Sequence, residues 1–226
     1  MKNILILTVS ILTINFGVLS AQTNKGTLFF GGTTAQNFTE TGYNFMGFGY
    51  SSATSKTDTD GYESPEPTKL LSFNLMPKAG YFVLENLVVG IDVNLAFSKI
   101  NYGSSSGENS ELLIGAGPFI RYYIPKTKVM PFFELNSLYG AYQEKSSYLN
   151  QDEIFEYDYN ASILTFGSGV GIAVPLGKKV NFDFLIGYDF YTIKDTEDNE
   201  ENRREVVGTI GLKLGFTILL GSDKNE

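Results

Sequence analysis

Apolar residues alternate with small or polar residues along most of the chain, and this period of two predicts β-strands with one apolar face. The clearest example is 87–98, where every odd-numbered residue is apolar and the even-numbered ones are mostly small or polar. The same alternation returns at 209–220. Similar stretches lie at 69–82, 111–123, 129–142, 159–174 and 180–191. With one further strand before residue 55, the pattern predicts an all-β chain of eight strands.

The predicted connections alternate strictly between short and long. Short turns fall near 84–86, 125–128 and 176–179. Long polar segments fall near 53–68, 101–110, 143–158 and 192–204. In an antiparallel up-and-down barrel, all short turns then gather at one end, which is the arrangement of transmembrane β-barrels with short periplasmic turns and long extracellular loops. A soluble lipocalin-like barrel, with its apolar strand faces inside, is the main alternative architecture.

The first strand has two candidate segments. Both 27–34 and 43–52 have an extended pattern, although only one more crossing is needed. Two separate crossings would make the strand number odd and would break the alternation of the connections. The sequence therefore predicts either one long strand bent near Gly42 or one crossing followed by an extension.

The chain begins with the three parts of a secretory signal peptide. Lys2 is the positive region, 4–19 is the apolar stretch, and Ser20 and Ala21 are small residues that suit cleavage before Gln22. A membrane-anchoring helix is the alternative, but this stretch is short and polar compared with the roughly 20 apolar residues of a helical span. We predict a signal peptide at 1–21 and one outer-membrane β-barrel domain at 22–226.

Absent residue types narrow the function more than any motif does. The chain contains neither cysteine nor histidine, which excludes disulfides and thiolate metal sites and removes the commonest general base. We therefore predict no catalytic site, no cofactor and no metal centre. The net charge of −8 argues against a nucleic-acid partner, because phosphate binding requires a basic face. The acidic run at 195–201 lacks the spacing of a calcium loop, and favours diffuse binding of divalent cations that bridge to lipopolysaccharide phosphates.

Charged residues also occur within the predicted strands, on the faces that carry small and polar side chains. A Lys or Arg that faces lipid at mid-bilayer costs about 2 to 4 kcal/mol, so these residues are expected to point into the lumen. Alternating glycines at 115–117 and 167–171 share these faces and suit the narrow lumen of an eight-stranded barrel. The predicted lumenal charge network comprises Lys78, Asp92, Arg121, Glu134, Asp183, Asp189 and Lys213.

Turn spacing predicts two ion pairs within this network. Lys78 and Asp92 are each seven residues from Glu85, and Arg121 and Glu134 lie almost symmetrically about the second short turn. Such positions face each other on neighbouring antiparallel strands. The other three residues are expected to join a wider network. The network either compensates buried charge or forms a path for ions or protons.

Aromatic residues gather near the predicted strand ends and are expected to form two interfacial girdles. The group beside the short turns comprises Tyr81, Phe82, Tyr122 and Tyr123. The group towards the long connections comprises Tyr139, Tyr142, Tyr188, Phe190 and Tyr191. Of these, Tyr123 and Tyr191 lie on the strand face that is predicted to line the lumen.

One phrase of the sequence resembles the strand, tight turn and strand of the small porin-like outer-membrane β-barrel domain proteins of Gram-negative bacteria. It reads Pro77-Lys78-Ala79-Gly80-Tyr81-Phe82-Val83 and continues with Asn86-Leu87-Val88-Val89-Gly90. The resemblance extends over essentially all of the chain after the signal peptide. It implies insertion into the cell outer membrane but no particular activity, because members of this family differ in role.

Three function classes follow from these expectations. We favour a structural or surface-interaction barrel with a lumen filled by side chains, surrounded by outer-membrane lipid and lipopolysaccharide, whose acidic extracellular loops meet envelope or surface protein partners. The alternative is a narrow porin-like channel or carrier for small solutes or ions, in which neutralising Asp92 or Glu134 would change conductance. A barrel enzyme acting on lipid or peptide is disfavoured, because it would resemble the outer-membrane acyltransferases, deacylases and proteases, which generally use a catalytic histidine that this chain lacks.

Overall fold

The computed structural model describes residues 23–37, 48–53, 67–103, 107–124, 129–150, 153–196 and 204–221, and the regular structure among them is all β-strand. In chain order the strands are β1 (Leu28–Asn37), β2 (Phe48–Ala53), β3 (Thr68–Leu84), β4 (Leu87–Asn101), β5 (Glu108–Tyr123), β6 (Met130–Asn150), β7 (Glu153–Pro175), β8 (Val180–Asp195) and β9 (Arg204–Leu220). The predicted signal peptide lies outside the described residues. A search of those residues finds no helix with the length and apolarity required to cross a membrane.

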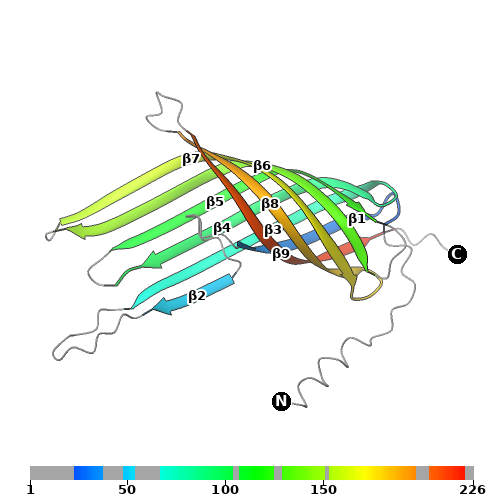
Figure 1. Cartoon of the computed structure of the whole chain (residues 1–226), viewed down its shortest axis with the longest axis horizontal. Coiled ribbons are helices and arrows are strands. Elements are labelled where there is room, and N and C mark those ends of the chain that lie inside the picture. The colour runs from blue at the N-terminus through cyan, green and yellow to red at the C-terminus, as the bar shows by residue number, and fades with distance from the viewer. Residues whose placement is uncertain are drawn as a thin grey trace, which may run out of the picture.

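The sheet closes on itself through β1. This strand pairs with β9 along its whole length and with β3 from Leu28 to Thr33, and all pairings are antiparallel. Following paired residues once around the barrel from Leu28 leads back to β1 beside Asn37, so the strands are staggered as closure requires. The strand pairing thereby confirms the predicted eight-stranded antiparallel up-and-down barrel. Figure 1 shows how its strands lie side by side in the wall.

The short strand β2 extends the barrel wall and is not a separate crossing. It begins where Phe48 pairs with Phe73, beyond the last pair between β1 and β3, Thr33 with Met76. β1 and β2 therefore follow one another along the same side of β3. Both segments thus belong to one crossing, as each predicted arrangement requires, and the bend predicted near Gly42 falls outside the described residues.

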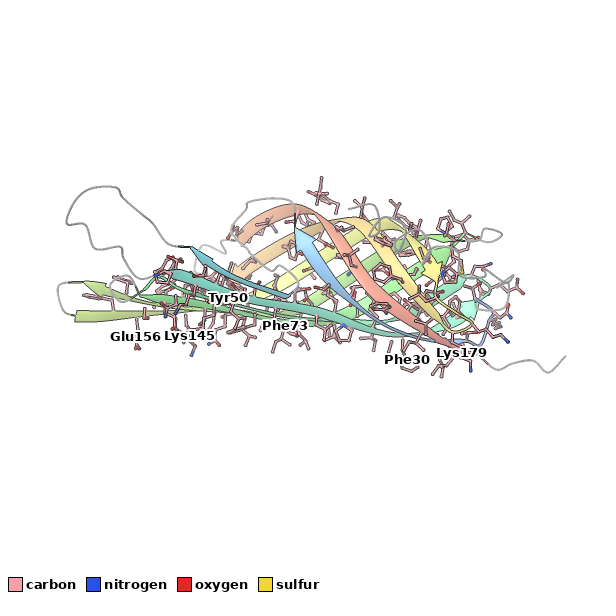
Figure 2. The ribbon with its side chains drawn as sticks, turned by 90° about the horizontal axis from the view of Figure 1, so that it is seen from below. Phe30, Tyr50, Phe73, Lys145, Glu156 and Lys179 are labelled. Atoms are coloured by element: carbon pink, nitrogen blue, oxygen red, sulfur yellow. The ribbon has the colours of Figure 1, made fainter. Side chains whose placement is uncertain are left out.

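Apolar strand faces point outward and polar faces point inward. On the outside, Ile91, Val170 and Ile186 are 60%, 62% and 58% exposed, whereas Asp92 and Arg121 in the interior are 0% and 1% exposed. Figure 2 shows the side chains that project from the outer surface around the barrel. A soluble barrel would have the opposite polarity, so the lipocalin-like alternative is wrong.

The described short turns are tight and hydrogen-bonded. Between β3 and β4, Asn86 has a φ of 65°, a left-handed conformation that asparagine tolerates better than most residues. The Thr23 hydroxyl donates to Asn86 Oδ1 at 2.6 Å and so attaches the N-terminal segment to this turn. Between β7 and β8, the Leu176 N–H donates to the carbonyl of Val180 at 2.8 Å. The turn predicted near 125–128 lies outside the described residues.

Within the segment 143–158, predicted as a long polar loop, residues 143–150 and 153–158 are instead strand. β6 and β7 stay paired as far as Asn150 and Glu153. The side chains of this segment still alternate, with stacked rings such as Tyr148 and Phe155 on one face and Lys145, Glu156 and Asp158 on the other. The prediction was wrong because it required every strand to have an apolar outer face. A strand that extends beyond the apolar band of the barrel does not need an apolar face.

One wall of the barrel continues beyond the rest. β8 ends at Asp195, opposite Ala161, while β7 and its partner β6 run on. Figure 1 shows β6 and β7 reaching past the end of β8, and Figure 2 places Lys145 and Glu156 on this part, far from Lys179 at the opposite end. We call residues 143–160 the β6–β7 extension.

Part of the expected aromatic girdles lies inside the barrel. Phe82 and Tyr142 are only 0% and 2% exposed and face the interior, so their assignment to the girdles was wrong. Tyr81, Tyr122 and Tyr139 do face outward, at 45%, 46% and 66% exposure. Successive residues of a strand point to opposite faces, so two adjacent aromatic residues supply one ring to each side of the wall.

Candidate functional site

The seven charged residues of the predicted lumenal network all lie in the barrel interior, and each is at most 5% exposed. They come from six strands and occupy inward positions, as the alternation of the sequence requires. The residues are Lys78 on β3, Asp92 on β4, Arg121 on β5, Glu134 on β6, Asp183 and Asp189 on β8, and Lys213 on β9. Three cations thus face four anions in a space that excludes bulk water.

Two of the ion pairs join neighbouring strands. Lys78 and Asp92 lie directly opposite each other on β3 and β4, with 3.0 Å between Nζ and Oδ2. Arg121 and Glu134 lie opposite each other on β5 and β6, and Arg121 Nε and Nη2 both approach Glu134 Oε2 at 2.6 Å. These are the two pairs that the turn spacing indicates.

Two further pairs cross the lumen between strands that are not adjacent. Lys78 Nζ is 2.5 Å from Glu134 Oε1, and Arg121 Nη1 is 2.5 Å from Asp183 Oδ2. Asp92, Lys78, Glu134, Arg121 and Asp183 therefore form one continuous chain of alternating charge, which we call the five-residue chain. Sequence spacing could not reveal the cross-lumen links, because spacing about a turn relates neighbouring strands only.

Lys213 and Asp189 form a separate pair. Lys213 Nζ is 2.8 Å from Asp189 Oδ2 and 2.9 Å from Oδ1. Within the described part of the chain, no ion pair links them to the five-residue chain. Of the three residues expected to join a wider network, only Asp183 contacts the predicted pairs.

Uncharged polar side chains add hydrogen bonds to the five-residue chain, although Asp92 Oδ1 and Asp183 Oδ1 are buried without a hydrogen-bond partner among the described residues. Asn136 Nδ2 donates to Asp92 Oδ2 at 3.1 Å, and the Thr217 hydroxyl donates to Asp183 Oδ2 at 2.7 Å. Arg121 Nη1 also donates to the Tyr123 hydroxyl at 3.1 Å. The sequence pattern gave one indication that Thr217 and Tyr123 belong here. Both occupy inward-facing positions on strands that also carry lumenal charges.

Aromatic rings surround the arginine. The guanidinium carbon of Arg121 lies 4.0 Å from the ring centre of Phe132 and 5.2 Å from that of Phe29. Lys78 Nζ similarly lies 5.3 Å from the ring centre of Phe119. A cation above the face of a ring is attracted by its quadrupole, and this attraction is stronger where water is excluded.

An apolar layer fills the lumen between the charges and the short turns. Its rings pack against one another: Phe82 stacks on Tyr123 at 5.9 Å, and Tyr123 contacts Phe132 at 5.6 Å between ring centres. The layer comprises Phe29, Phe82, Val88, Phe119, Tyr123, Met130, Phe132, Ala173, Leu185 and Leu219. These side chains occupy the cross-section of the barrel at this end.

A second apolar cluster lies on the other side of the charges. It comprises Ala96, Leu113, Tyr142, Ala161, Ile163 and Ile193, with Tyr159 and Tyr191 packed against it. Between this cluster and the Lys213–Asp189 pair is a cavity of about 30 Å³, lined in part by Met76 and Leu138. A volume of this size holds roughly two water molecules. The interior described by the structure is thus filled in layers.

Two carboxylates lie above these layers, where the outer face turns polar. Glu111 on β5 is directly opposite Glu144 on β6. Glu144 accepts hydrogen bonds from Asn109 Nδ2 at 3.2 Å and from the Tyr142 hydroxyl at 3.3 Å. Burial, together with the negative charge of Glu144, raises the pKa of Glu111 to about 7. This carboxyl can therefore change its charge near neutral pH.

The arrangement suits charge compensation better than ligand binding. Each cation of the network contacts a carboxylate, and the buried carboxylates accept bonds from within the protein. The described residues contain no group of three or more acidic side chains placed to hold a metal ion. Chemically, the network can fix the cross-section of the lumen and can exchange protons or ions only if its pairs separate.

No family model and no curated protein matches the chain. Among solved structures, it is similar to the outer membrane protein OprG of Pseudomonas aeruginosa, with 13% identity, 88% of this chain and 98% of that chain covered, and a TM-score of 0.41. It is also similar to Ail, the attachment invasion locus protein of Yersinia pestis, with 16% identity, coverages of 86% and 99%, and a TM-score of 0.40. The N-terminal β-barrel domain of Pseudomonas aeruginosa OprF gives 10% identity, coverages of 87% and 98%, and a TM-score of 0.32. At these values the architecture assigned to the chain rests on its own strand pairing.

Proposed function

We propose that the protein is an integral barrel of the cell outer membrane, exported with cleavage of residues 1–21, which has a structural or surface-interaction role and does not conduct solutes. The apolar outer band supports the membrane location. Ile91, Val170 and Ile186 are each more than half exposed there, and β-barrels and helices are the two structures that span a bilayer with their backbone groups satisfied.

The filled lumen is the observation that supports a barrel closed to solutes. A solute that crossed the barrel would have to displace the rings of the apolar layer and separate pairs such as Arg121–Asp183, at 2.5 Å. Breaking one partner away from a buried pair costs about 3 to 5 kcal/mol. The β6–β7 extension, with exposed Lys145, Tyr157 and Glu156, then supplies the surface on which a role outside the membrane depends.

The experiment is an ion-leak assay on protein refolded into lipid vesicles, with folding checked by the change of gel mobility on heating. Folded protein that leaves an entrapped ion-sensitive dye unquenched supports the closed barrel. The alternative function, a narrow channel for small ions or solutes, is motivated by the charged lumen. It requires a leak that changes when Asp92 or Glu134 is replaced by its neutral amide.

A further inference from the structure

In the part of the chain that the structure describes, one edge of β7 has no partner strand above the barrel. β8 ends at Asp195 opposite Ala161, whereas β7 continues towards Glu153 with β6 as its partner. Among the described residues, none pairs with the other side of β7 between 153 and 159. An unpaired edge presents a row of backbone donors and acceptors that can bind another strand.

The hydrogen bonds at the end of β8 identify the free backbone groups. The Thr196 N–H and hydroxyl both donate to the Asn160 carbonyl, at 3.1 and 2.8 Å, so Asn160 directs its carbonyl towards the β8 side. In an antiparallel strand, alternate residues direct both backbone groups to the same side. Ile154, Glu156 and Asp158 therefore present their N–H and C=O groups at the open edge, while the residues between them bond to β6.

Charge decides which kind of strand fits. The segment 153–160 contains three acidic residues and no Lys or Arg. Glu156 is exposed, and Asp158 is half exposed, with a 3.5 Å ion pair to Lys145 and a 3.4 Å hydrogen bond from Gln143 Nε2. In an antiparallel pair of two copies of this edge, acidic side chains would face one another, which is unfavourable. A strand with basic residues at alternate positions would place its cations beside Glu156 and Asp158.

The opposite face of the same edge is aromatic. Tyr148 stacks on Phe155 with 5.4 Å between ring centres, and Tyr157 stacks on Tyr159 at 6.4 Å. Tyr157 is 54% exposed, so its ring is accessible to a neighbouring strand. Cross-strand pairs of aromatic with β-branched residues stabilise sheets, and an arginine could also lie on these rings.

We propose that the open edge of β7 binds an extended segment of another polypeptide in which basic and apolar residues alternate. The segment adds a strand beside Ile154, Glu156 and Asp158, with its basic side chains on the acidic face and its apolar side chains on the aromatic face. The inference rests on the proposed function, which places this edge outside the membrane.

The first test uses two synthetic peptides of equal length, one alternating lysine with valine and the other alternating glutamate with valine. Each is titrated into the folded, full mature protein in lipid nanodiscs, while hydrogen exchange is followed at individual amides. The expected result is saturable binding of the basic peptide alone, with slower exchange at the amides of Ile154, Glu156 and Asp158. Binding without this protection would mean simple electrostatic attraction and would overturn the proposal, as would equal binding of both peptides.

The second test removes one edge donor. Glu156→Pro deletes an N–H that points away from β6, so the hairpin can keep its ladder, and Glu156→Ala is the matched control that loses the same charge but retains the N–H. The proline variant should bind the basic peptide about tenfold more weakly than the alanine variant, the size expected for losing a hydrogen bond and its neighbours. Equal affinities of the two variants contradict strand addition.

Other occupants give different results. Concentration-dependent dimerisation that Glu156→Pro abolishes would assign the edge to a second copy of the chain, against the charge argument. Ion leak through a barrel that still binds the basic peptide would overturn the closed-lumen function and leave this inference intact. A closed barrel that does not bind the basic peptide would overturn this inference and leave the closed-lumen function intact.

Discussion

Lys78 on β3 and Glu134 on β6 form an ion pair across the interior of the barrel, with 2.5 Å between Nζ and Oε1, although β4 and β5 separate their strands. The same lysine pairs with Asp92 beside it, and the same glutamate with Arg121. The pair therefore connects two local contacts into one chain of charges that ties opposite walls together. Stability and closure of the barrel are expected to depend on this chain as a unit.

Arg121→Met tests that dependence. The substitution removes the cation that Asp183 contacts and one of the two that Glu134 contacts, the other being Lys78. Removing one partner of a buried pair typically costs about 3 to 5 kcal/mol, so the unfolding midpoint in guanidinium should fall markedly for protein in lipid vesicles. Arg121→Lys keeps the charge but loses the planar fork that reaches both carboxylates, and should be intermediate. Wild-type stability of Arg121→Met would contradict the account.

Gly167→Ala tests how tightly the lumen is filled. A Cβ at Gly167 would lie 2.0 Å from Asn136 Oδ1 and 2.4 Å from Asp189 Oδ1, so both side chains must move. Overpacking of this kind costs about 1 to 3 kcal/mol. Gly32→Ala is the matched control, because a Cβ there meets nothing within 4 Å. Equal unfolding midpoints for the two variants would show that the interior is looser than described.

The stability of the sheet around Glu111 should depend on pH. Its folded-state pKa of about 7 is raised above the ordinary 4.5, so the proton binds the folded state more tightly. The resulting stabilisation is complete below pH 4.5 and is lost as the pH rises through 7. Discounted for solvent screening at a partly buried site, the change is roughly 1 kcal/mol.

Hydrogen exchange measures this effect directly. After correction for intrinsic rates, amides near Glu111 and Glu144 should be better protected at pH 5 than at pH 8. Glu111→Gln should remove the difference, because Glu144 then faces a neutral amide and Ser98, on the β4 side, carries no charge. A difference that survives in Glu111→Gln would assign it to another group.

Export should remove the first 21 residues. Intact-mass measurement of the protein recovered from membranes should give a chain that begins at Gln22, the residue after the small pair Ser20 and Ala21. A full-length mass would contradict the signal peptide and favour the anchoring helix.

The sequence predicts the barrel because membrane strands must alternate. Where one face meets lipid and the other a narrow lumen, positions such as Ile91 and Asp92 can belong only to opposite faces. The pairing of Lys78 with Asp92 follows from their equal spacing about Glu85, but it also depends on an irregularity between Phe82 and Leu84 that shifts the ladder by one residue. Beyond the apolar band a strand no longer has one face against lipid, so apolar residues need not alternate with polar ones. This explains why the segment 143–158 has the composition of a loop.

The cross-lumen contacts could not be predicted for a different reason. Lys78 meets Glu134, and Arg121 meets Asp183, through the width of a closed barrel. Whether two such side chains meet across the lumen depends on the stagger of all the strands together. A local sequence pattern does not contain this information. The edge of β7 that no described strand covers could not be predicted either, because it depends on β8 ending before β7, at Asp195.

The most direct test of the central claim is the conductance of refolded wild-type protein in planar bilayers, on samples whose gel mobility changes on heating. The account predicts no channel steps, because rings and ion pairs occupy the lumen on both sides of Arg121. Reproducible, ion-selective steps that change in Asp92→Asn would contradict it and would make the buried charges a conduction path.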